Sequence, residues 1–152
     1  MYKENSMEEL LDLYKSNESD NSLLLELCKR YLSPTSGKYF DLEKAYKFYK
    51  RVNMNMLDEY SMDNIAVSIF FNDYSVYESL KDKFSSDNLN TIGARFVGNK
   101  VCPKNLNKAI EFYIKALEVD ELNKYPSSNL YHIYSDVENN VSDPVLANKY
   151  FN

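Results

Sequence analysis

The chain has 152 residues, of which 44% are hydrophobic and 27% are charged, and its formal net charge at pH 7 is −5. This composition is typical of one folded soluble domain and excludes a largely disordered chain. No apolar run approaches the roughly 18 residues that a membrane-spanning helix needs, and the first residues are too acidic and too broken for a signal peptide. We therefore expect a cytoplasmic protein with no membrane partner.

Residues that commonly carry chemistry are scarce. The chain contains one histidine, two cysteines and three glycines. A zinc site needs a spaced cluster of cysteines and histidines, and a phosphate-binding loop is rich in glycine. The two cysteines also do not form a disulfide framework. We therefore predict a protein without a cofactor, a metal site or a catalytic residue.

The first predicted helix begins after Ser6. Ser6 and Glu9 have the spacing of a capping box, in which the hydroxyl and the carboxylate satisfy free amides at a helix start. This pattern predicts a helix over residues 7–15, and the polar turn that follows lets the chain reverse into a second helix over residues 22–32.

Later helix starts are marked by capping residues and prolines. Asp41 and Asn105 precede apolar periodic stretches and are predicted N-caps. Pro126 fits the opening turn of a helix, and Asp143 is followed by Pro144, whose missing amide costs nothing at that position. Together these signals predict about nine helices.

Two stretches of the chain share the same order of residue types. An aromatic residue ends the first helix of each stretch, at Tyr31 and Phe96, and a Lys-Ala pair follows in the second helix, with the alanines at Ala45 and Ala109. The alanines are about two paired-helix repeats apart. A degenerate copy is therefore expected between them.

Residues 62–84 fit that place, with Ile65 in a first helix, a tight turn at Asn72 and Asp73, and Phe84 in a second helix. A fourth copy follows near the end of the chain, where Ala147 takes the place of the repeat alanine. The core positions of the four first helices are expected to be Leu27, Ile65, Ile92 and Leu130.

The third copy resembles the Sel-one-like repeat, a relative of the tetratricopeptide repeat. The matching positions are Ile92-Gly93, Phe96, Gly98, Val101, Asn105, Lys108-Ala109, Phe112-Tyr113 and Lys115-Ala116. The first copy has Cys28 where the family has glycine, and the fourth has Leu146 where the family has lysine. The resemblance implies an all-α, right-handed solenoid of paired antiparallel helices, with an adaptor role and no enzymatic activity.

The resemblance also gives a layout for the chain, as a single helical-repeat domain over residues 1–152. Its predicted parts are an N-terminal capping helix at 1–21, a repeat at 22–54, a degenerate repeat at 55–86, the best-matching repeat at 87–121 and a C-terminal repeat, complete or incomplete, at 122–152.

A candidate binding strip follows from this geometry, because the first helices line the concave side of such a superhelix. The strip comprises Glu26, Lys29, Asn64, Asn90, Ala94, Asn129, His132 and Asp136. Asparagine amides both donate and accept hydrogen bonds, which suits an extended peptide or a loop. The alternative is that these asparagines reflect the overall composition, since asparagine is frequent throughout the chain.

The resemblance to the Sel-one-like repeat implies two functions for such a strip. The first is an adaptor or scaffold that binds a protein or peptide partner with modest affinity. The second is an immunity protein that masks a toxin or effector, which would bind one folded partner very tightly.

An enzyme is a third hypothesis. His132 lies one helical turn from Asp136 and could form a polarised base if both side chains faced a cleft. The same spacing also describes an ordinary surface pair on an exposed helix.

The charge is unevenly distributed. Residues 29–51 carry seven Lys or Arg against two acids, and residues 95–115 carry five against one. The rest of the chain is strongly acidic and would repel a phosphate backbone, so we do not expect nucleic acid as a partner. The basic segments could steer an acidic partner or simply form a solvated face.

The last predicted helix is short. An apolar edge around Ala147, Tyr150 and Phe151 could stack against a second copy of the chain, so self-association through this edge is a further expectation.

Overall fold

The computed structural model describes residues 2–52, 59–98 and 101–151. Within these ranges the chain forms nine α-helices and two 3-10 segments and has no β-strand, which confirms the all-α class. Contacts divide it into two compact units, Met1–Val76 and Tyr77–Asn152, and the boundary falls inside α5. The predicted repeat boundary at 54 and 55 lies outside the described residues.

Among the helices that are described, none is both long enough and apolar enough to span a bilayer.

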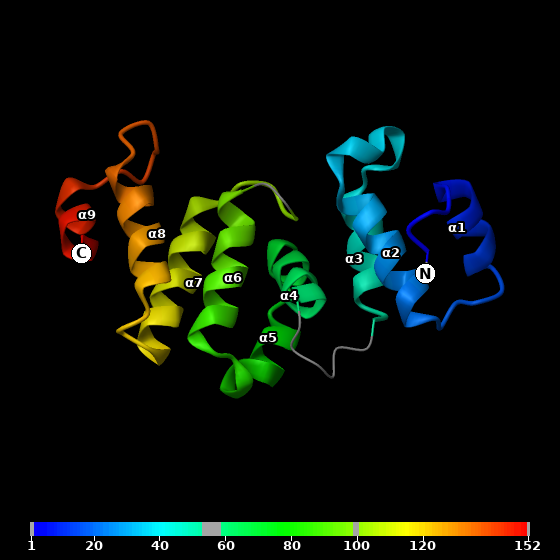
Figure 1. Cartoon of the computed structure of the whole chain (residues 1–152), viewed down its shortest axis with the longest axis horizontal. Coiled ribbons are helices and arrows are strands. Elements are labelled where there is room, and N and C mark those ends of the chain that lie inside the picture. The colour runs from blue at the N-terminus through cyan, green and yellow to red at the C-terminus, as the bar shows by residue number, and fades with distance from the viewer. Residues whose placement is uncertain (1, 53–58, 99–100, 152) are drawn as a thin grey trace. The chain divides into compact units, whose positions relative to one another are not determined.

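The first unit is built from α1 to α4 and a 3-10 connection (Figure 1). The elements are α1 (Met7–Tyr14), α2 (Asn21–Leu32), η1 (Pro34–Tyr39), α3 (Leu42–Tyr49) and α4 (Glu59–Phe70).

Side-chain caps fix the starts of α1 and α2. Ser6 Oγ accepts a hydrogen bond from the backbone N–H of Glu9 at 3.2 Å, and the Asp20 carboxylate accepts one from the N–H of Leu23 at 3.2 Å. The Tyr2 hydroxyl donates to the same carboxylate at 2.6 Å. The helices predicted over 7–15 and 22–32 therefore agree with the structure to within one residue.

Helices α2 and α3 pack closely because small residues lie where they meet. The Cys28 thiol donates to the carbonyl of Ala45 at 3.6 Å, and both residues are fully buried. The backbone N–H of Asp41, just before α3, donates to the carbonyl of Tyr31 near the end of α2 at 2.9 Å. This bond joins the two ends of the connection that contains η1.

Helix α4 ends in the predicted tight turn. Asn72 adopts a left-handed conformation with φ of 62°, and the N–H of Asp73 returns to the carbonyl of Ser68 at 2.8 Å. The Asp73 carboxylate also accepts a 2.6 Å hydrogen bond from the Tyr46 hydroxyl of α3. This contact ties the turn to the preceding helix.

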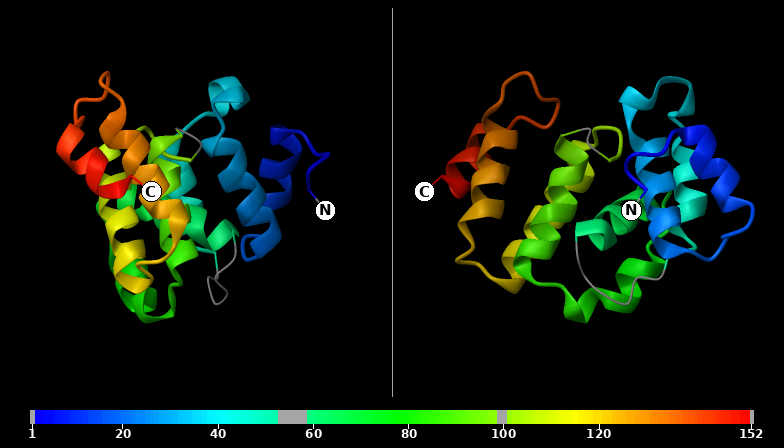
Figure 2. Two further views of the ribbon diagram at one scale, coloured as in Figure 1. Left: turned by 60° about the vertical axis from the view of Figure 1, so that its left-hand side comes forward. Right: turned by 45° about the vertical axis from the view of Figure 1, so that its right-hand side comes forward.

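The second unit begins within α5 and contains the elements that follow it, and two further views show its helices (Figure 2). From this helix onward the elements are α5 (Ser75–Leu80), η2 (Lys81–Lys83), α6 (Ser86–Val97), α7 (Leu106–Val119), α8 (Lys124–Ser135) and α9 (Pro144–Tyr150).

Helices α6 and α7 are antiparallel and are joined at both ends. The N–H of Asn105 donates to the carbonyl of Phe96 at 2.8 Å, and at the opposite end Ser86 Oγ donates to the carbonyl of Ala116 at 2.8 Å. Between these bonds the helices approach so closely that a Cβ atom added to Gly93 would lie 2.8 Å from the ring of Tyr113. Any side chain at this position would force the Tyr113 ring to shift, so glycine is favoured here.

The same backbone hydrogen bond recurs at three equivalent places. In each, the N-cap residue of the second helix donates to the carbonyl of the aromatic residue that ends the first helix. The pairs are Asp41 with Tyr31 at 2.9 Å, Asn105 with Phe96 at 2.8 Å and Asp143 with Tyr134 at 3.0 Å. The predicted N-caps are confirmed, and the sequence alignment of these helix pairs corresponds to a shared local geometry.

The predicted core positions are buried as well. Each has a relative exposure of 0%: Leu27, Ile65, Ile92 and Leu130. One predicted core position on each of α2, α4, α6 and α8 thus faces the interior.

Candidate functional site

The predicted strip begins on α2, where Glu26 and Lys29 are half-buried. The Glu26 carboxylate accepts a hydrogen bond from Arg30 Nε at 3.0 Å. Arg30 in turn holds the N-terminal segment, because its guanidinium donates to the carbonyls of Lys3 and Asn5 at 3.1 and 2.9 Å. Glu26 is therefore engaged in an interaction within its own unit.

Asn64 on α4 is a correction to the predicted strip. Its side chain is only 2% exposed, so a partner cannot reach it in this structure. Helix α4 is buried on more than one face, since Ser61 and Val67 are buried beside the core residue Ile65. Within the described part of the chain neither amide atom of Asn64 has a hydrogen-bond partner, an arrangement that typically costs about 1–3 kcal/mol.

Two strip residues of the second unit lie in direct contact. Asn129 Nδ2 on α8 donates to Asn90 Oδ1 on α6 at 3.0 Å, and both side chains are half-buried. The bond leaves the Asn90 amide nitrogen and the Asn129 amide oxygen without a partner among the described residues. A donor and an acceptor are therefore presented side by side. Ala94, one turn further along α6, is half-buried.

The last two strip residues, His132 and Asp136, are exposed near the C-terminal end of α8. Asp136 Oδ1 accepts from the backbone N–H of Glu138 at 3.0 Å, and the His132 ring lies 5.5 Å from the ring of Tyr131. In the described structure no hydrogen bond or ion pair joins the side chains of His132 and Asp136. His132 and Asp136 therefore do not form the hydrogen-bonded pair that a polarised base requires.

Basic side chains on the second helices cover aromatic rings. Lys44 Nζ lies 5.7 Å from the ring centre of Tyr31, and Lys108 Nζ lies 5.8 Å from that of Phe96. These are equivalent positions in the two helix pairs. Each contact is a cation–π interaction, which gives the repeated lysine a structural role that sequence analysis missed.

Two of the three residues of the predicted C-terminal edge are partly or wholly covered. Ala147 is buried, and Tyr150 is half-buried with its ring stacked 6.1 Å from that of Tyr134. These two residues lie one turn apart on the face of α9 that packs against α8. Phe151 is 63% exposed and lines an open hollow together with Ala147.

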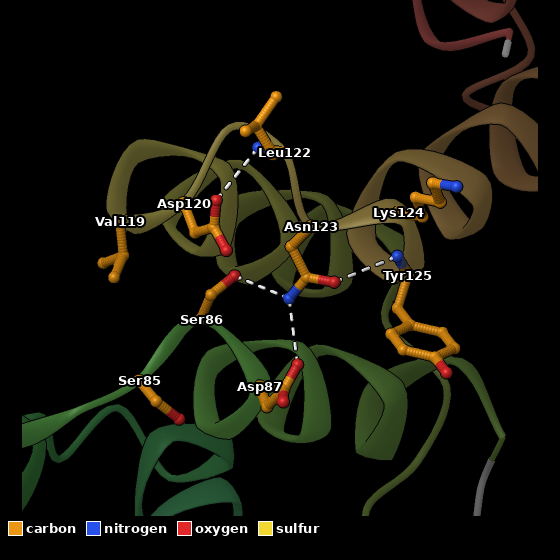
Figure 3. Close-up of a pocket in the computed structure, with 9 residues that line it drawn as sticks. All are labelled: Ser85, Ser86, Asp87, Val119, Asp120, Leu122, Asn123, Lys124 and Tyr125. Atoms are coloured by element: carbon orange, nitrogen blue, oxygen red, sulfur yellow. Dashed lines mark hydrogen bonds between the residues drawn. The ribbon is translucent and has the colours of Figure 1, made fainter.

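Sequence analysis also missed a hollow at the turn between α7 and α8, which we call the α7–α8 hollow (Figure 3). Its volume is about 700 Å³ and it is open to solvent. The lining residues are Ser85, Ser86, Asp87, Val119, Asp120, Leu122, Asn123, Lys124 and Tyr125.

The floor of the α7–α8 hollow is a closed network of hydrogen bonds. Asn123 Nδ2 donates to Ser86 Oγ at 2.8 Å and to Asp87 Oδ1 at 2.9 Å, as Figure 3 shows. Asn123 Oδ1 accepts from the backbone N–H of Tyr125 at 3.1 Å and so caps α8. The side chain of Asn123 thereby fixes the start of α8 against the start of α6.

The rim of the hollow is apolar and exposed. Val119, Leu122 and Tyr125 are 56%, 82% and 70% exposed. The turn that carries them is held by Asp120, whose Oδ1 accepts from the N–H of Leu122 at 3.0 Å. The only sequence signal for this site is that Leu122 and Tyr125 are large and lie outside the core positions of the repeat.

The described residues contain no group of three or more His, Cys, Asp or Glu side chains that could hold a metal ion. Cys28 and Cys102 are buried thiols, and burial raises the pKa of the Cys28 thiol above its ordinary value. Cys28 is therefore an unreactive core residue.

Comparisons of the whole chain with protein families, curated proteins and solved structures found no match.

Proposed function

We propose that the chain is a Sel-one-like helical-repeat protein, wound as a right-handed solenoid, that binds a segment of a partner protein and performs no catalysis. Support for the repeat comes from the three equivalent backbone bonds that join the first and second helices, and from the buried register shared by the first helices. Such repeats offer extended surfaces on which other proteins are held.

The observation that carries the binding proposal is the Asn90–Asn129 pair. The pair offers one amide donor and one amide acceptor, and a peptide group in an extended segment offers the complementary acceptor and donor. Recognition of the peptide backbone would give affinity, and the neighbouring exposed side chains of His132 and Asp136 would contribute side-chain selectivity.

The proposal is tested by capture and then by quantitative binding. Immobilised wild-type chain captures partners from native lysate, mass spectrometry identifies them, and calorimetry with each purified partner gives the affinity. The test variant is Asn90→Ala/Asn129→Ala. The matched control is Asn107→Ala/Asn148→Ala, which removes two exposed helical asparagines of the same unit.

We expect the test variant to bind about tenfold more weakly, because two hydrogen bonds of about 0.5–1.5 kcal/mol each are lost, and the control to bind like the wild type. Equal affinity for all three proteins would refute the role of the asparagine pair.

A further inference from the structure

The α7–α8 hollow presents apolar side chains that its own fold does not use. Three residues at the connection between α7 and α8 are each more than half exposed: Val119, Leu122 and Tyr125. These three side chains do not hold the turn in place, because its hydrogen bonds are made by the polar side chains of Asp120 and Asn123. Clustered exposed apolar residues around a concave surface are typical of an interaction site.

The floor of the hollow argues against a small polar ligand. Both amide hydrogens of Asn123 are used by Ser86 and Asp87, and the Ser86 hydroxyl is donated to the carbonyl of Ala116. An anionic ligand would in addition meet the carboxylates of Asp87 and Asp120, which line the hollow. A ligand that fits must instead gain from apolar contact at the rim.

The charges around the hollow specify the occupant further. Asp87 and Asp120 line it, and Glu118 and Glu121 are exposed beside Asp120 in the chain. Lys124 is the single basic residue among the lining residues. Among the lining residues two carboxylates outnumber one ammonium, and Glu118 and Glu121 add negative charge next to Asp120 in the chain, so this surface attracts a cationic partner and repels an acidic one.

We propose that the α7–α8 hollow docks a protein segment in which an arginine or a lysine neighbours an aliphatic side chain. The aliphatic side chain packs on Leu122 and Tyr125, and the cation lies beside the carboxylates of Asp87 and Asp120. Tyrosine supplies a large contact area with little loss of side-chain entropy, which suits it to this role. The proposal goes beyond the asparagine pair, uses none of the same residues and does not depend on it.

The test is a titration of the isotope-labelled full chain, followed by NMR amide shifts. The probes are three capped tetrapeptides, Arg-Leu-Leu-Arg, Arg-Ser-Ser-Arg and Glu-Leu-Leu-Glu. The first carries both required features, and each of the others lacks one. We expect saturable shifts at Asp87, Leu122, Asn123 and Tyr125 with the first peptide, and weakening of its affinity at high salt.

Two variants separate the two contributions. Asp87→Asn/Asp120→Asn removes the charge but keeps an oxygen for each hydrogen bond now accepted from Asn123 and Leu122. We expect it to weaken binding about three- to tenfold and to abolish most of the salt dependence. Leu122→Ser removes the most exposed apolar side chain of the rim and should weaken binding by a similar factor while leaving the salt dependence in place.

The matched control is Glu111→Gln/Val145→Ser, which makes the same kinds of change at exposed positions outside the hollow and should bind like the wild type. The proposal is overturned if the three peptides shift the same amides equally, or if none shifts the rim. It is also overturned if the rim amides shift with protein concentration alone, because a second copy would then be the occupant.

Discussion

The connection between α6 and α7 and the turn between α4 and α5 each join two helices, but they are stabilised by different chemistry. In the first, the N–H of Asn105 bonds to the carbonyl of Phe96, and the neutral Asn105 amide caps α7 by accepting from the N–H of Lys108 at 3.1 Å. In the second, the charged carboxylate of Asp73 accepts from the N–H and the hydroxyl of Ser75 at 3.1 and 2.5 Å.

The difference extends to the packing around each connection. The α6–α7 pair is held by the close approach at Gly93 and by the buried ring of Phe96. The α4–α5 turn is tied to α3 through the Tyr46 hydroxyl, which donates to Asp73, and through the stacking of Tyr46 on Phe71 at 4.7 Å. The stability that packing gives to a connection should not depend on pH, whereas the stability that a carboxylate gives should fall when the carboxylate is protonated.

The largest effect is expected from Phe96→Ala. The ring is fully buried, and its removal leaves a cavity at the end of α6, so the free energy of unfolding should fall by about 4 kcal/mol. The comparison variant is Phe71→Ala, whose ring is only half-buried and which should lose less. Urea unfolding followed by circular dichroism measures both, and equal losses would contradict the difference in packing.

The second-largest loss of stability is expected when Gly93 is replaced by alanine. Gly93→Ala places a Cβ atom 2.8 Å from the Tyr113 ring and 3.2 Å from the carbonyl of Ala109, so we expect a loss of about 2 kcal/mol despite the better helix propensity of alanine. Gly98→Ala is the control, because its Cβ would meet only an ordinary contact at 3.7 Å. Thermal unfolding should show a lower melting temperature for the first variant and little change for the second.

Asp73→Ala should cost about 1–2 kcal/mol near pH 7, because it removes an acceptor at a helix start and the tie to Tyr46. Hydrogen bonds from Ser75, followed by that from Tyr46, lower the pKa of Asp73 from 3.8 to about 2. The folded state therefore gains from this carboxylate above about pH 4, and the gain is lost as the pH falls toward 2.

The same cluster raises the pKa of Tyr46 to about 12, mainly through desolvation and then through its hydrogen bond to Asp73. Its contribution is therefore complete below pH 10 and is lost as the pH rises through 12. Unfolding by urea at a series of pH values measures these effects. A difference between wild type and Asp73→Ala that stays constant between pH 7 and pH 2.5 would refute the assignment.

The smallest effect is expected from Asn105→Ala, at about 1 kcal/mol for the loss of a neutral cap. Because an amide does not titrate, this loss should be the same near pH 7 and near pH 2.5. The measurement is the same urea series. A loss for Asn105→Ala that changes with pH as much as the loss for Asp73→Ala would remove the difference between the two connections.

The sequence by itself determined where most of the helices begin and which of their positions are apolar. The caps at Asp41, Asn105 and Asp143 and the buried register of Leu27 and Ile92 were predicted and are confirmed. These features depend on residues within one or two helical turns, so the local order of side chains suffices to specify them.

Only the tertiary structure decided which surface residues a partner can reach. It buries Asn64, bonds Asn129 to Asn90, turns Ala147 and Tyr150 toward α8 and surrounds a polar floor at Asn123 with exposed side chains. Each outcome depends on contacts between helices, most of them between residues far apart in the chain. A helical pattern fixes which face of a helix is apolar, but not which neighbouring helix covers its polar positions.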